Sequence, residues 1–159
     1  MRKDDFSESL DATDISILKH IQNDARISNS KLADKLSLSE TPCWRRWKRL
    51  EQTGYINRYT AVLNQKKLGY TMSGFTQVTL GSHEEDATDL FEQFVISADW
   101  IPLCHCITGS ADYIVQIIAR DIDEYYARIH ELRRVKAVSA LHSSVSVKEI
   151  KNNNFIPLD

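Results

Sequence analysis

The stretch that decides the fold of the N-terminal half reads Thr41-Pro42-Cys43-Trp44-Arg45-Arg46-Trp47-Lys48-Arg49-Leu50-Glu51. Cys43, Trp47 and Leu50 lie four and three residues apart, so they share one face of a helix. The remaining faces are polar and strongly cationic. This spacing therefore predicts an amphipathic helix that ends at Gly54.

Two shorter helices are predicted upstream of this one. The first is capped by Asp11 or Thr13, and the second opens at Ser28 or Asn29. A short polar turn separates the second helix from the third, as in a helix-turn-helix motif. Residues 55–64 are strand-like and predict a wing or a linking strand. The apolar stripe of the first helix consists of Leu10, Ile15, Leu18 and Ile21.

The second half has the pattern of an α+β domain. Strand-like and helical segments follow in the order β-α-β-β-α-β, which is the ferredoxin-like plan. Two helices cover one face of such a sheet. Apolar residues on both faces of the segment 112–119 favour a second chain, and so a homodimer, on the other face. The segments are 70–80, 84–97, 101–108, 112–119, 121–134 and 138–148.

Length and composition are those of an ordinary globular protein. The chain has 159 residues, of which 42% are hydrophobic and 26% charged, and this excludes a largely disordered chain. No apolar run approaches the roughly 18 residues of a membrane-spanning helix. Acids follow Met1 where a signal peptide would have its apolar core, so we expect a cytoplasmic protein with no membrane partner.

The net charge of −2 hides an asymmetry between the two halves. Residues 1–69 carry 13 Lys and Arg against 9 Asp and Glu, whereas residues 70–159 carry 7 against 13. An excess of positive charge in the first half indicates a polyanionic partner. The expected domains are a flexible arm at 1–9, a winged helix-turn-helix domain at 10–58, a linker strand and hinge at 59–69, and a ferredoxin-like domain at 70–159.

A cationic third helix is typical of a protein that binds double-stranded DNA in the major groove. Arg reads guanine with two hydrogen bonds, Lys mostly neutralises phosphate, and helix N-termini offer N–H groups to phosphate. The alternative is a basic helix face that is merely solvated. DNA binding is favoured because the basic run lies on the third helix of a three-helix unit. The candidate DNA-binding residues are Ser28, Asn29, Ser39, Thr41, Pro42, Trp44, Arg45, Lys48 and Arg49.

Several motifs in the N-terminal half resemble those of one family. They read Leu10-Asp11-x-x-Asp14-x-x-Ile17-Leu18, Asp24-Ala25-Arg26-Ile27-Ser28, Leu38-Ser39-x-Thr41-Pro42-Cys43-x-x-Arg46, Leu50-Glu51-x-x-Gly54-x-Ile56 and Tyr59-Thr60-Ala61. With them the chain resembles the Lrp/AsnC transcriptional regulators, over nearly its whole length. The resemblance implies a winged helix-turn-helix domain joined to a ferredoxin-like, amino-acid-sensing domain. It also implies a homodimer that assembles into tetramers or octamers.

The resemblance further implies an effector site in the turn before the segment 112–119. The family motif Gly-x-x-Asp-Tyr falls on 109–113, where Gly109 suits positive φ and Asp112 suits pairing with an α-ammonium group. Without the family, the same residues are first of all a hairpin turn. The candidate effector-binding residues are Thr108, Gly109, Ser110, Asp112, Tyr113 and Ser143.

The run Cys104-His105-Cys106 raises the question of a metal site. On a strand the two cysteines point the same way and His105 points the opposite way. A closed zinc site needs four convergent ligands. We therefore expect core or interface cysteines, with a redox-sensing thiol as the alternative. We also expect no metal and no cofactor, only an amino-acid effector.

Three functions are weighed against these features. The first is a sequence-specific transcriptional regulator whose DNA binding or assembly is modulated by a small amino acid. The second is a nucleoid-like architectural protein with little sequence preference, which the sequence does not separate from the first. The third is an enzyme, which is disfavoured because the sequence contains no catalytic triad, phosphate-binding glycine loop or metal-spaced acid cluster.

Overall fold

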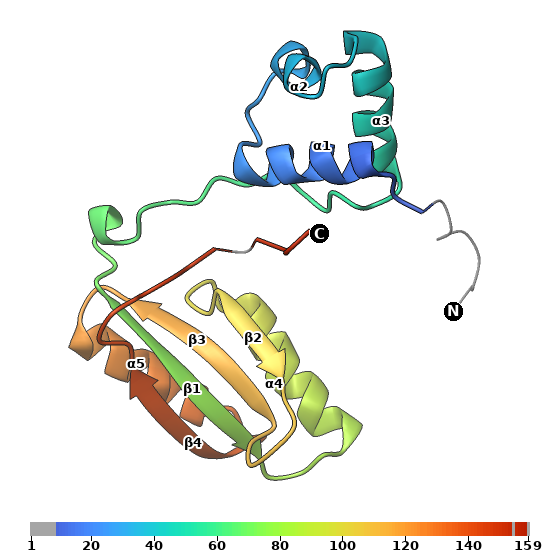
Figure 1. The fold of residues 1–159 in the computed structure, drawn as a ribbon. Helices are drawn as coiled ribbons and strands as arrows, with labels where there is room; N and C mark the ends of the chain where they lie inside the picture. The colour runs from blue at the N-terminus through green and yellow to red at the C-terminus, as the bar shows by residue number, and fades with distance from the viewer. Residues whose placement is uncertain (1–8, 154, 159) are drawn as a thin grey trace. The chain divides into compact units, whose positions relative to one another are not determined.

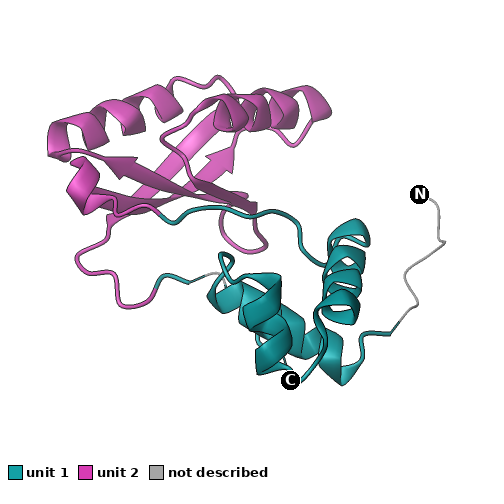
Figure 2. Cartoon of the chain, turned by 90° about the horizontal axis from the view of Figure 1, so that it is seen from above, with its two compact units in different colours: residues 1–62, 152–159 teal, residues 63–151 magenta. Residues whose placement is uncertain are grey.

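The computed structural model describes residues 9–153 and 155–158, and these form two compact units (Figure 2). Unit 1 comprises residues 1–62 and 152–159, and unit 2 comprises residues 63–151. The sequence pattern predicts that the tail belongs to the second domain, whereas the structure assigns residues 152–159 to unit 1. Nearly all of the expected flexible arm, residues 1–8, lies outside the described residues.

The described part of unit 1 contains three helices, α1 (Ala12–Asn23), α2 (Asn29–Lys35) and α3 (Glu40–Gln52) (Figure 1). Asp11 caps α1 through a capping box with Asp14, and the Ser28 side chain caps α2. The turn between α2 and α3 contains Ser37 at φ 55°, and Gly54 follows α3 at φ 78°. These caps and turns confirm the predicted helix-turn-helix motif and explain its boundaries.

The core of unit 1 lies between the three helices. The α3 residues Cys43, Trp47 and Leu50 are buried, as their spacing predicts. The stripe proposed for α1 is corrected at one position, because Ile17 rather than Ile15 is completely buried. The other buried apolar residues of this core are Ile21, Ile27, Leu32 and Ala33.

The predicted wing strand at 55–64 is wrong, because these residues form no strand in the structure. A strand needs a neighbouring strand to satisfy its backbone, and none pairs with this segment in the described part of the chain. Tyr59 instead lies against α3. Its hydroxyl accepts a hydrogen bond from Trp47 Nε1 at 2.6 Å and donates one to Glu51 at 2.8 Å.

The end of the chain returns to unit 1 as an extended segment. The side-chain amide of Gln22 on α1 pairs with the backbone of Ile156 through two hydrogen bonds. Gln22 Nε2 donates to the Ile156 carbonyl at 3.0 Å, and the Ile156 N–H donates to Gln22 Oε1 at 2.7 Å. Unit 1 is therefore built from both ends of the described chain.

Unit 2 has the predicted ferredoxin-like order, with two helices on one face of an antiparallel sheet (Figure 1). The strands lie in the order β2-β3-β1-β4, so the first and third strands are central. Within unit 2 no described helix covers the other face. The elements are η1 (Lys66–Leu68), β1 (Met72–Leu80), α4 (Glu85–Ser97), β2 (Leu103–Cys106), β3 (Tyr113–Ala119), α5 (Ile122–Arg133) and β4 (Val138–Val145).

The core of unit 2 lies between the sheet and its two helices. Alternate residues of β1 and β3 point into it, as a strand's two-residue period requires. Phe91 of α4 and Leu132 of α5 are completely buried against them. Gly74 of β1 packs directly under the hydroxyl group of Tyr125 on α5. Leu80 at the end of β1 and Tyr113 at the start of β3 belong to this core, and they flank the position of the candidate effector residue Asp112.

Candidate nucleic-acid interface and ligand site

The outer face of α3 presents the side chains that the sequence assigned to DNA. Thr41, Trp44 and Arg45 are exposed, and Arg45 makes no hydrogen bond or ion pair with another described residue. Lys48 Nζ lies 4.6 Å from the centre of the Trp44 ring and 2.6 Å from a carboxylate oxygen of Glu51. The face therefore combines one unpaired guanidinium with a lysine that is held in place by its neighbours.

The other two arginines of α3 point toward α1. Arg46 Nη1 lies 2.6 Å from Asp11 and 3.0 Å from Asp14, and Arg49 Nη2 binds the second oxygen of Asp14. The Asp14 N–H and the Arg46 guanidinium hold the pKa of Asp11 below its ordinary value. Arg49 was a candidate DNA contact, and the structure uses its guanidinium to orient α3 on α1.

The N-termini of α2 and α3 differ in which polar side chains remain available to bind a phosphate. Asn29 Nδ2 donates to the Glu40 carbonyl at 3.0 Å, so this side chain joins α2 to α3. Ser28 Oγ accepts a hydrogen bond from the Lys31 N–H at 3.3 Å. The Ser39 side chain makes no capping bond at the start of α3, where Pro42 is half-buried. Ser39 and the first turn of α3 are thus the more available of the two.

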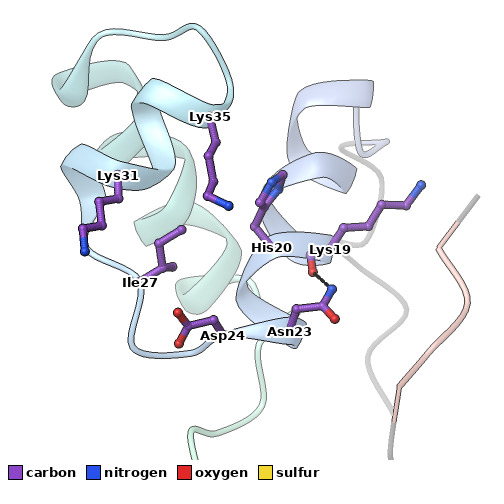
Figure 3. A pocket seen from close by; sticks show the side chains of 7 residues that line it. All are labelled: Lys19, His20, Asn23, Asp24, Ile27, Lys31 and Lys35. Carbon is purple, nitrogen blue, oxygen red and sulfur yellow. Dashed lines mark hydrogen bonds between the residues drawn. The ribbon is translucent and has the colours of Figure 1, made fainter.

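Sequence reasoning missed a cationic hollow between α1 and α2 (Figure 3). Its volume is about 370 Å³. Lys35 of α2 and His20 of α1 face each other across it, as Figure 3 shows. The helical spacing of Lys31 and Lys35 was the signal that could have revealed it. The hollow is lined by Lys19, His20, Asn23, Asp24, Ile27, Lys31 and Lys35.

The turn between β2 and β3 is closed by a hydrogen bond from the Ile107 N–H to the Asp112 carbonyl at 2.8 Å. Gly109 lies at its tip with φ 126°, a value that a residue with a side chain rarely adopts. Thr108 and Ser110 on either side of it are exposed. The structure therefore brings these three candidate residues together on the surface of unit 2.

Asp112 lies at the base of this turn, beside the end of β1. Its Oδ2 accepts a hydrogen bond from the Leu80 N–H at 2.7 Å, and its Oδ1 accepts one from His83 Nε2 at 2.9 Å. Its own N–H donates to the Val78 carbonyl at 3.0 Å. The Leu80 N–H and then His83 hold the pKa of this carboxyl below its ordinary value. Sequence reasoning gave His83 no role at the effector site.

Two candidate effector residues lie away from the turn surface. Tyr113 is buried under α4, where its hydroxyl donates to Glu92 at 2.8 Å, and burial followed by this carboxylate raises its pKa. Ser143 lies on β4, two strands away from β3. Its partner on β1, Thr76, pairs in turn with Val115, which is three residues beyond Asp112, so Ser143 is displaced from Asp112 both across the sheet and along it. The Ser143 Oγ is 2.8 Å from Thr76 Oγ1. Within a single chain, therefore, neither the Tyr113 hydroxyl nor the Ser143 hydroxyl lies beside the Asp112 carboxylate.

The cysteines of β2 lie on the helix-covered side of the sheet, opposite Val115 and Tyr113 of β3. Burial, and then the nearby Glu92, raises the pKa of Cys104 to about 11, while Cys106 is exposed. Across residues 9–153 and 155–158, no three His, Cys, Asp or Glu side chains are grouped as a metal ion would require. No helix there is long and apolar enough to cross a membrane.

Comparison with known proteins matches a family model to each unit. A family model described as winged helix-turn-helix DNA-binding matches residues 10–57, and the Lrp/AsnC ligand binding domain matches residues 73–155. A DNA-binding helical unit joined to a ligand-binding domain defines a transcriptional regulator. The chain belongs to the Lrp/AsnC family of such regulators, which confirms the resemblance seen in its sequence.

Individual relatives match over nearly their whole length. The leucine-responsive regulatory proteins of Escherichia coli (strain K12) and Salmonella typhimurium are each 36% identical over 151 residues, which covers 92% of this chain and 90% of theirs. A transcriptional regulator of Neisseria meningitidis, solved as a complex with L-methionine, has a TM-score of 0.92 at 31% identity, and the match covers 95% of this chain and 98% of that one. An AsnC family regulator of Agrobacterium tumefaciens has a TM-score of 0.89 at 28% identity, covering 94% and 97%.

Proposed function

We propose that this regulator reads duplex DNA through the outer face of α3 and responds to an amino acid bound at the β2–β3 turn. The observation that supports the proposal is that the arginines of α3 make different contacts. Arg46 and Arg49 fix the helix on α1, which leaves Thr41, Trp44 and Arg45 directed outward. A helix oriented in this way suits the major groove. Such a regulator works on chromosomal DNA, so we keep the cytoplasm as its expected location.

The open face of the sheet supports a homodimer as the working unit. Phe75 is 42% exposed on that face, and Ile114 and Ile118 beside it are only half-buried. A pair of chains that covered these residues would remove apolar surface from water. It would also present two copies of α3 to two half-sites of an operator. Assembly of such dimers into tetramers or octamers belongs to the same proposal.

L-Methionine and L-leucine are the first effectors to test. The Neisseria meningitidis regulator was solved with L-methionine, and the Escherichia coli and Salmonella typhimurium relatives are leucine-responsive proteins. An amino acid needs an acceptor for its α-ammonium group and donors for its carboxylate. We expect Asp112 to supply the first, and backbone N–H groups of the turn around Gly109, which has a positive φ, to supply the second.

The proposed DNA reading is tested by selecting duplexes from a random pool with the full-length protein and then measuring the affinity of variants. Arg45→Ala should weaken binding to the selected duplex about tenfold or more, because one base-reading guanidinium is lost. Lys48→Ala should weaken binding to all duplexes alike and lower the salt dependence by about one ion. Lys148→Ala, an exposed lysine of unit 2, is the matched control.

Unchanged affinity of both α3 variants would refute the proposed placement of α3. The architectural alternative gives a different result in the same selection. A protein that coats DNA yields no consensus sequence, and its Arg45→Ala variant loses affinity equally on every duplex.

A further inference from the structure

His83 has no role in the proposed function, yet it binds the residue at the centre of the candidate effector site. Its Nε2–H donates to Asp112 Oδ1 at 2.9 Å. His83 lies in the loop that joins β1 to α4, and its side chain is 76% exposed. The Asp112 side chain is only 23% exposed beneath it. The imidazole therefore lies on the solvent side of this carboxylate.

The other side of the carboxylate is already committed. Oδ2 accepts the Leu80 N–H at the end of β1. The Asp112 backbone is tied on both sides, by its N–H to Val78 and by its carbonyl to the Ile107 N–H. The backbone of Asp112 is thereby fixed, and its carboxylate cannot turn away without losing the hydrogen bond from Leu80. A ligand that arrives from solvent with an ammonium group therefore meets Oδ1, and Oδ1 is where His83 is bound.

We propose that His83 is a latch on the effector site, and that the α-ammonium group of an amino acid displaces its imidazole from Asp112 Oδ1. The proposal rests on the effector function proposed above. Both groups donate to one oxygen, and an ammonium is the stronger partner because it is always charged near neutral pH. In the free protein both oxygens of the Asp112 carboxylate are thus hydrogen-bonded. The effector replaces the His83 imidazole as the donor to Oδ1.

The loop that carries His83 is built to allow this exchange. Gly81 at its start donates its N–H to the Ala137 carbonyl at 2.8 Å, which anchors the loop independently of the histidine. Ser82 Oγ accepts the Glu84 N–H at 3.2 Å before α4 begins. Release of the imidazole therefore exposes a side chain to water without breaking a backbone hydrogen bond of the loop.

The test is isothermal titration of the full-length protein with L-methionine and, separately, with L-leucine. His83→Ala removes the competing donor and should bind the amino acid about fivefold more tightly, the value of one typical hydrogen bond. His83→Gln retains an N–H donor at this position and should stay within about twofold of the wild type. His130→Ala, an exposed histidine on α5, is the matched control. The His83 imidazole resonances should also shift when the effector is added.

The possible outcomes separate this inference from the function on which it rests. Wild-type binding that is unchanged or weakened by His83→Ala overturns the latch and leaves the effector site in place. Absence of binding to both amino acids, in the wild type and in His83→Ala, overturns the choice of effector and the latch with it. Tighter binding by His83→Ala but not by His83→Gln supports both.

Discussion

The two units bury their polar side chains in different ways. Among the described residues of unit 1, the buried polar side chain is a charged one, Asp14, which is 1% exposed and binds both Arg46 and Arg49. In unit 2 it is Thr76, a neutral residue that needs only the hydroxyl of Ser143. Small helical units have little apolar surface to bury. Unit 1 therefore uses charge to orient a helix, whereas unit 2 relies on the apolar contacts of a sheet.

The strongest test of this contrast removes the buried charge of unit 1. Asp14→Ala breaks the capping box and both ion pairs, so it should destabilise unit 1 by about 2–4 kcal/mol. Hydrogen exchange of the full-length protein should show faster exchange in α1 and α3 and none of this change in unit 2. Asp34→Ala, an exposed acid on α2, is the control and should have almost no effect. Equal acceleration in both units would contradict the contrast.

The matching test in unit 2 disturbs packing and leaves charge alone. A methyl group at position 74 would lie 2.1 Å from the Tyr125 hydroxyl oxygen and 2.9 Å from the Ser144 carbonyl. Gly74→Ala should therefore destabilise unit 2 by about 1–3 kcal/mol, the range typical of overpacking. Gly81→Ala is the control, since its new methyl group would find ordinary contacts of 3.6 Å or more. Faster exchange in unit 1 peptides would show that the units are not independent.

Acid should weaken each unit through its own carboxylate. The pKa of Asp11 is lowered mainly by the Asp14 N–H and then by Arg46, and that of Asp112 mainly by the Leu80 N–H and then by His83. A folded-state pKa below the ordinary value of 3.8 adds stability above pH 3.8, and this is lost as the pH falls below it. Asp11→Asn should reduce the acid sensitivity of unit 1 alone, and Asp112→Asn that of unit 2 alone. Exchange rates between pH 5 and pH 3 provide the measurement.

The smallest expected effect concerns the thiols, which report burial in both units. At pH 8 a thiol with a pKa of about 11 is ionised in about one molecule per thousand. Iodoacetamide should therefore label the exposed Cys106 first and Cys104 slowly. Cys43, which is buried in unit 1, should be labelled only after unfolding. Peptide mass spectrometry gives the order, and early labelling of Cys43 would show that unit 1 opens readily.

The sequence predicted the architecture well because its signals are periodic. Cys43, Trp47 and Leu50 defined α3, and the six segments of unit 2 all appear as strands or helices. The stripe on α1 was misplaced because Asp14 lies at a core position. A charged residue interrupts an apolar pattern, and only the arginines of a distant helix make its burial favourable. The strand predicted at 55–64 is absent because the β-propensity of a segment does not supply a neighbouring strand with which it can pair.

The candidate sites were predicted less completely, because their residues act through contacts that spacing does not reveal. Nothing in the run of basic residues on α3 shows that Arg49 turns inward while Arg45 stays outside. The pairing of His83 with Asp112 joins residues 29 positions apart, through the end of β1. Contacts of this kind follow from the tertiary fold alone. The DNA-binding and effector residues remain predictions that the experiments above address.

The return of the chain's end to α1 has a consequence for genetics. Because Gln22 pairs with the backbone of Ile156, the helical unit is discontinuous in the gene. A stop codon or frameshift after β4, which spares every strand of the sheet, would still remove two hydrogen bonds from α1. Likewise, an expression fragment that ends at residue 62 would lack residues 152–159, which belong to the same unit.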